Sequence, residues 1–200
     1  MWMNRFLAVF TVALLGACGG DSGALGDSPT VSGQVTLPGR NASGWTMQAR
    51  VGNAMATAPI DAAGRFSIQL PGGDALTGAL GSSSFSIGCN MNQVSVSPST
   101  VRSVTASFAI IANNQPFQQP TPVTIGAKSG AFDTLSVAYV FFDHDASASG
   151  TVNCLGGDFP STVDVNVRKG WNVLLSLEVA FGHLETSGPL PSAAQWKAGM

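Results

Sequence analysis

The densest cluster of chemically active side chains is Asp143-His144-Asp145, directly after the apolar run of residues 137–142. Two carboxylates at i and i+2 share one face of a strand or converge in a turn, where their oxygens could bind a divalent cation. Ca²⁺ needs six to eight oxygen ligands, and no Asp/Asn/Gly loop pattern surrounds this pair. We therefore expect a polar hairpin tip and no cofactor, with Asp143 and Asp145 as the residues that a metal would use.

Acid–base and nucleophilic chemistry would have to use His144, His183, Glu178, Glu185 and the many serines. A serine hydrolase of the α/β type places its nucleophile on a Gly-x-Ser-x-Gly turn, and no such turn occurs here. Glycoside hydrolysis needs two carboxyl groups about 5–9 Å apart, and the spacing of the two glutamates does not place them as a pair. We predict no enzymatic activity, with a hydrolase as the third interpretation.

Three tryptophans are the candidate binding residues: Trp45, Trp171 and Trp196. Aromatic rings are enriched where proteins contact other proteins, and they also stack on sugars. More often, such rings pack in the core or cap strand ends. Both interpretations stay open at the level of sequence.

The N-terminus carries a targeting signal. Arg5 is followed by ten mainly apolar residues, 6–15, which are too few to span a bilayer and fit the core of a signal peptide. The next residues, Leu15-Gly16-Ala17-Cys18, resemble the lipobox of bacterial lipoproteins. The resemblance implies cleavage after residue 17, acylation of Cys18 by chains such as palmitate, and a membrane anchor in the cell envelope, facing the periplasm or the exterior.

The segment after Cys18 is expected to be a flexible tether. Residues 18–29 are rich in glycine and show no periodicity. A Gly-rich chain of this length spans roughly 18 Å root-mean-square. The remaining residues, 30–200, would then form the folded domain.

The other two cysteines are expected to form a disulfide. With Cys18 acylated, Cys89 and Cys154 remain as a pair in an oxidising compartment. Such a bond would close a long loop and stabilise the fold by about 4 kcal/mol. Two free thiols or a metal pair are the alternatives, although no CxxC or Cys/His cluster accompanies either cysteine.

Composition excludes some partners. Charged residues make up 10% of the chain and the formal net charge is −2, where about 25% charged residues is usual. Without a basic patch we expect no nucleic-acid partner.

Strands and turns must position all of these residues. Residues 65–70 alternate apolar and polar side chains, and residues 162–181 suggest one long hairpin around Arg168-Lys169-Gly170. Short strands separated by Gly, Pro and Asn turns predict an all-β, antiparallel β-sandwich, either as one large unit or as two closely packed small ones. The Pro- and Asn/Gln-rich residues 112–122 are the candidate internal boundary.

Two segments resemble the strand–turn–strand core of transthyretin-like or carboxypeptidase-regulatory-like β-sandwiches. They are Val31-Ser-Gly-Gln-Val35 and Ala58-Pro-Ile-Asp-Ala-Ala-Gly-Arg-Phe-Ser-Ile-Gln-Leu-Pro71. The wider layout of the chain is similar to a group of small bacterial lipoproteins. This layout adds Gly88-Cys89, Tyr139-Val-Phe-Phe-Asp143, Ser149-Gly-Thr-Val-Asn-Cys154 and Lys169-Gly-Trp-Asn-Val-Leu174. The resemblance implies a fold and no activity. We therefore expect a structural or protein-interaction lipoprotein of the envelope, and as the alternative a glycan- or peptide-binding module that uses aromatic residues and exposed strand edges.

Overall fold

The computed structural model describes residues 23–37, 44–82, 94–112, 120–128, 134–154, 159–179 and 182–199. The predicted signal peptide, Cys18 and Cys89 lie outside these residues, as does the side chain of Cys154.

The described chain consists mostly of β-strands, which confirms the predicted all-β class. The strands are β1 Ala24–Gly26, β2 Thr30–Thr36, β3 Trp45–Val51, β4 Ala54–Pro59, β5 Arg65–Gln69, β6 Gly81–Ser82, β7 Ser95–Ser97, β8 Arg102–Thr105, β9 Ser107–Ala112, β10 Thr121–Lys128, β11 Thr134–Phe142, β12 Ala146–Cys154, β13 Phe159–Val167, β14 Gly170–Val179, β15 Gly182–Ser187 and β16 Gln195–Ala198. One helical turn, α1 (Gly73–Leu76), continues into a short 3₁₀ turn at Thr77–Ala79. No described helix has the length and apolar character needed to cross a membrane.

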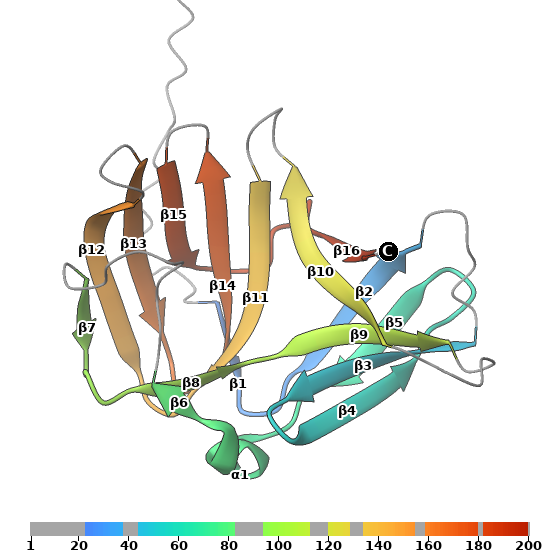
Figure 1. The fold of residues 1–200 in the computed structure, drawn as a ribbon. Coiled ribbons are helices and arrows are strands. Elements are labelled where there is room, and N and C mark those ends of the chain that lie inside the picture. The colour runs from blue at the N-terminus through green and yellow to red at the C-terminus, as the bar shows by residue number, and fades with distance from the viewer. Residues whose placement is uncertain are drawn as a thin grey trace, which may run out of the picture.

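The strands join into one strongly curved sheet with the order β4-β3-β9-β10-β11-β14-β15-β13-β12-β7 (Figure 1). Most pairings are antiparallel, as predicted, but β13 pairs with β15 and β16 with β2 in parallel. β9 and β10 are neighbours in the sheet, so the stretch considered as an internal boundary joins two paired strands.

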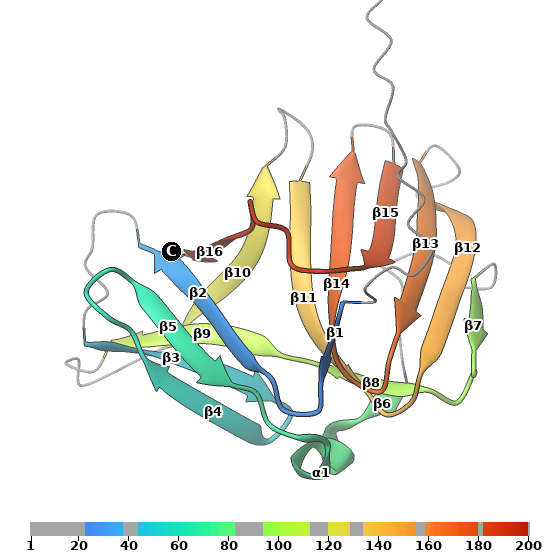
Figure 2. The same cartoon turned by 180° about the vertical axis from the view of Figure 1, so that it is seen from behind.

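The larger core fills the half of the molecule built from β2, β5, β3, β4, β9, β10 and β16, where β2 and β5 form one layer and β3, β4 and β9 the other (Figures 1 and 2). Its centre is aromatic: the Trp196 ring meets Phe66 and Phe108 edge-on at centroid distances of 4.8 and 4.9 Å, and stacks on Tyr139 at 6.0 Å. Edge-to-face rings at such distances add to the stabilisation from burial.

A smaller core lies on the other face of the strands that both halves share. Along β11, Val137 and Tyr139 point into the larger core, whereas Val140 and Phe142 point into the smaller one. The alternation of side chains along a strand allows one strand to serve both cores. The two halves are therefore joined through β11 and β14.

The hairpin predicted over residues 162–181 is wrong. β13 and β14 do not pair, because β15 inserts between them, antiparallel to β14 and parallel to β13. The turn that joins β13 to β14 is held by the buried Asn172, whose amide oxygen accepts from Arg168 N–H and whose amide nitrogen donates to the carbonyls of Arg168 and Gly170. These bonds satisfy the backbone of the turn without the ladder that a hairpin would require.

Residues 24–28, which the sequence assigned to a flexible tether, are attached to the folded domain. β1 pairs with β14, which attaches residues 24–26 to the sheet. The next residues are attached through their side chains: the Asp27 carboxylate accepts from Gly73 N–H, and the Ser28 hydroxyl donates to the Leu70 carbonyl. Glycine content alone did not reveal these contacts because their partners lie far along the chain.

Candidate functional site beside strand β2

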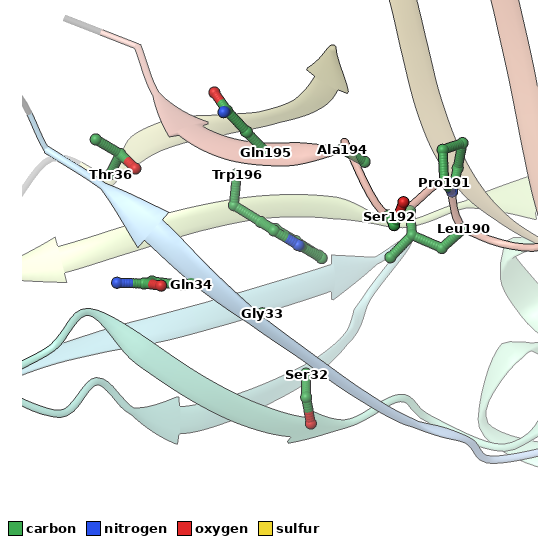
Figure 3. Close-up of a pocket in the computed structure, with 10 residues that line it drawn as sticks. All are labelled: Ser32, Gly33, Gln34, Thr36, Leu190, Pro191, Ser192, Ala194, Gln195 and Trp196. Atoms are coloured by element: carbon green, nitrogen blue, oxygen red, sulfur yellow. The ribbon is translucent and has the colours of Figure 1, made fainter.

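A pocket of about 570 Å³ opens where β2 and the chain that leads into β16 diverge (Figure 3). Figure 2 shows this chain crossing in front of β14 and β11, on the side that also carries β1 and β2, on its way from β15 to β16. The pocket is lined by Ser32, Gly33, Gln34, Thr36, Leu190, Pro191, Ser192, Ala194, Gln195 and Trp196. None of these residues is charged, so the pocket suits a neutral polar ligand.

The pocket lies along an unpaired stretch of sheet edge. β5 pairs with residues 30–34 of β2 on one side. On the other side β16 pairs only with Val35 and Thr36. Among the described strands, none covers residues 30–34 on the pocket side.

The direction of the backbone groups follows from two hydrogen bonds at the ends of this stretch. Leu70 N–H donates to the carbonyl of Pro29, and Val35 N–H donates to the carbonyl of Gly64. Backbone groups alternate from side to side along a strand, so the odd-numbered residues of β2 direct theirs toward β5. Ser32 and Gln34 therefore direct their N–H and carbonyl groups away from β5. The parallel pairing of Val35 with Trp196 uses the Gln34 carbonyl, so the Ser32 backbone groups and the Gln34 N–H face the pocket.

The side chains of these two residues already have partners on the β5 side. Ser32 Oγ donates to Ser67 Oγ at 3.0 Å, and Gln34 Nε2 donates to the carbonyl of Ala63 at 2.7 Å. A ligand in the pocket would therefore meet the main chain of β2 and not these side chains.

Gly33 allows β2 to pass over the floor of the pocket. A Cβ at this position would overlap Nε1 and Cδ1 of the Trp196 indole. Trp196 is only 2% exposed and lies in the larger core, so its ring has little room to move aside. The position of the edge therefore depends on the absence of a side chain at residue 33.

Trp171 and Trp196 do not provide a surface for stacking on a sugar. Both rings are buried, and Trp171 Nε1 donates to the Pro71 carbonyl at 2.9 Å. Trp45 is partly buried and packs against the larger core. Of the two interpretations left open by the sequence, core packing describes Trp171 and Trp196, because a stacking site needs an accessible ring face.

Asp143 and Asp145 lie in the polar connection between β11 and β12, and each engages different partners. Asp143 accepts from the backbone N–H and the Nε of Arg102, both at 2.8 Å, and contacts His144 Nδ1 at 2.9 Å. Partial burial raises the pKa of Asp143, but the hydrogen bonds from Arg102 and His144 outweigh it and hold the pKa at about 2.

Asp145 accepts from the backbone N–H of Lys169 at 2.8 Å and from Arg168 Nη1 at 3.0 Å. The Lys169 N–H, followed by the Arg168 guanidinium, lowers the pKa of this exposed carboxyl. The two aspartates thus tie the connection to β8 and to the β13–β14 turn. In the described part of the chain, no three His, Cys, Asp or Glu side chains are grouped so that they could hold a metal.

The structure brings together polar side chains that the sequence did not group. Ser176 Oγ lies 3.4 Å from His183 Nε2. Glu185 is buried in β15 directly opposite Ser176, and burial raises its pKa. Only the insertion of β15 between β13 and β14 reveals this grouping, and no local pattern signals it.

The chain matches no family model, no curated protein and no solved structure.

Proposed function

We propose that the chain is a non-enzymatic, lipid-anchored interaction module of the bacterial envelope, which binds an extended polypeptide segment at the β2 edge. The observation that carries this proposal is the unpaired stretch of residues 30–34 beside the pocket. An extended segment that adds to a sheet edge gains main-chain hydrogen bonds, and nearby pockets select its side chains.

The proposed contacts follow from the geometry of the edge. A strand placed about 4.8 Å from β2 would exchange hydrogen bonds with the N–H and carbonyl of Ser32 and accept one from the N–H of Gln34. Its side chains would meet Ser192, Gln195 and Pro191 across the pocket. Because none of the lining residues is charged, we expect a neutral, polar segment.

The anchor rests on the lipobox-like Leu15-Gly16-Ala17-Cys18. Two or more acyl chains hold a protein stably on a membrane, whereas one chain does not. Because β1 already belongs to the sheet, the tether from Cys18 is short and would hold the folded part close to the membrane surface. Mass spectrometry of the native N-terminus should find acyl chains on Cys18, and an intact N-terminus beginning at Met1 would refute the anchor.

The proposed disulfide is supported by the pairing of β7 with β12. The two strands run antiparallel, with Ser95 opposite Ser149. Cys89 precedes Ser95, and Cys154 follows Ser149, by similar numbers of residues. Because the strands are antiparallel, the start of β7 and the end of β12 lie at the same end of this strand pair.

Strand addition can be tested with a photo-crosslinking amino acid at Ser192, on the pocket, and at Thr57 as a control on the exposed face of β4. In intact cells, position 192 should give an adduct to a discrete peptide segment and position 57 should not. Equal adducts from both positions would contradict a specific site.

The captured segment should then be synthesised and N-methylated one residue at a time. Strand addition predicts that methylation at alternate residues weakens binding to the purified chain by about tenfold or more, since alternate N–H groups face β2. Uniform tolerance of N-methylation would exclude main-chain pairing and refute the proposed mode.

A further inference from the structure

A second polar cluster lies far from the pocket, on one face of β13, β14 and β15. The register places Ser176 opposite Glu185 and Ser161 opposite His183. Paired residues in a sheet project from the same face, with Cβ atoms about 4.5–5.5 Å apart. The four side chains Ser161, Ser176, His183 and Glu185 therefore form one group, which we call the β15 cluster.

The β15 cluster continues the face that carries the smaller core. Val163, Val165 and Leu174 lie on the same face of β13 and β14, further along the strands. Ser161 is 5% and Glu185 is 8% exposed, whereas Ser176 and His183 are half-buried. The cluster thus combines a buried floor with a side that solvent can reach.

The buried members have no polar partner within the described part of the chain. Among the described residues, neither the Glu185 carboxyl group nor the Ser161 hydroxyl makes a hydrogen bond or an ion pair, and the only polar contact in the cluster joins Ser176 to His183. Buried polar groups in folded proteins are nearly always hydrogen-bonded, and a buried carboxyl without a partner needs an explanation. A bound ligand that donates hydrogen bonds would provide one.

The charges around the cluster favour a cation. Among the described side chains on this face, the other charged groups are Glu178, opposite His183, Lys128 on β10 and Lys197 on β16. β11 and β14 separate both lysines from β15. No described Lys or Arg side chain therefore lies next to Glu185. When both glutamates are ionised, this end of the face is negative.

The donor atoms distinguish between kinds of cation. Hydroxyl oxygens are weak metal ligands but good hydrogen-bond acceptors, and a primary ammonium carries three N–H donors and no acceptor. Glu185, Ser161 and Ser176 offer three acceptor groups on three adjacent strands. We propose that the β15 cluster is a binding site for a primary ammonium group, with Glu185 as its counter-ion.

Binding through Glu185 is linked to pH. Burial raises the pKa of this carboxyl, and the protonated form cannot act as a counter-ion. At low pH, binding of the ammonium must therefore release the proton from the Glu185 carboxyl group. Affinity should rise with pH until Glu185 is fully ionised and then level off.

The test uses the mature chain and methylammonium as the probe, with tetramethylammonium as a control that has the same charge but no N–H donor. The chain has two histidines, so the ring signals of His183 report on the site and those of the exposed His144 serve as an internal control. At pH 8, methylammonium should shift the His183 signals saturably, with a dissociation constant of about 10 mM for so small a ligand. Tetramethylammonium should leave them unchanged.

Matched variants separate the counter-ion from general charge. Glu185→Gln should weaken methylammonium binding by about tenfold or more, whereas Glu178→Gln, an exposed glutamate on the same face, should change it less than about threefold. Equal responses to the two ammonium ions, or unchanged binding in Glu185→Gln, would overturn the proposal. A shift of the His183 signals by stoichiometric Zn²⁺ without one by methylammonium would also overturn it, in favour of a metal.

Discussion

Gly33 has the most direct effect of any single residue on the candidate peptide site. It lies in the middle of the unpaired edge and against the Trp196 indole. Because Trp196 also contacts Phe66 and Phe108, a side chain at residue 33 would disturb the larger core and the pocket together. Binding and stability are thus coupled at this position.

We predict that Gly33→Ala destabilises the fold by about 1–3 kcal/mol, the usual cost of overpacking a filled core. Chemical denaturation followed by tryptophan fluorescence measures the change. Gly78→Ala is the control, because a Cβ at Gly78 meets nothing within 4 Å. Equal stability of Gly33→Ala and Gly78→Ala would contradict the close contact between β2 and the Trp196 indole.

Glu185 determines a pH dependence of stability. Burial raises its pKa above the value of 4.5 that it has in an unfolded chain. The folded state therefore holds its proton more tightly, and this contribution to stability is complete below pH 4.5 and is lost as the pH rises through the folded-state pKa. Glu185→Gln should accordingly be more stable than the native chain at neutral pH.

The difference in the free energy of unfolding between the native protein and Glu185→Gln should disappear near pH 4, where Glu185 is protonated in both the folded and the unfolded state. Urea denaturation across this pH range, in an amine-free buffer, provides the measurement. Glu178→Gln, at an exposed position, should show little pH-dependent change. A Glu185→Gln variant that is less stable than the native chain at pH 7 would indicate an ionic partner for Glu185.

At the scale of elements, the order β14-β15-β13 is the feature on which the β15 cluster depends. The buried Asn172 holds the turn from β13 to β14 with three hydrogen bonds, and β15 occupies the space between the two strands. Ser187 adds a further link, because its hydroxyl bonds to both the N–H and the carbonyl of Asn166 on β13.

We predict that Asn172→Ala costs about 2–3 kcal/mol, since it leaves one N–H and two carbonyl groups of the turn without partners. Hydrogen exchange should show faster opening at residues 168–170, and denaturation should show the loss of stability. Asn166→Ala, at an exposed position on β13, serves as the control. Equal stability of the two variants would mean that backbone pairing alone holds the turn.

At the scale of the whole molecule, two cores on opposite faces of β11 and β14 join the halves into one body. The proposed disulfide would add a link between the segment before β7 and the end of β12. A bond that closes so long a loop acts mainly on the unfolded chain.

Non-reducing peptide mapping of the native protein should recover Cys89 linked to Cys154. Reduction should lower the free energy of unfolding by about 4 kcal/mol. The double variant Cys89→Ser/Cys154→Ser should reproduce the loss and should not respond to reductant. Free thiols in protein isolated from intact cells would remove the disulfide from the proposal.

The sequence by itself determined the class of the fold and the local form of many elements. Alternation in residues 65–70 and the Gly and Pro turns predicted strands that the structure contains, because side-chain period and turn chemistry are properties of neighbouring residues. The targeting signal and the cysteine pairing are likewise sequence predictions, and they remain to be tested.

Only the tertiary structure decided which strands are neighbours. Residues 31–35 predict a strand, but whether its edge is paired depends on β16, which lies far along the chain. Likewise, the spacing of Ser176, His183 and Glu185 has no meaning until β15 enters between β13 and β14. Long-range pairing is selected by the burial of whole faces, so both candidate sites arise from contacts that no local pattern encodes.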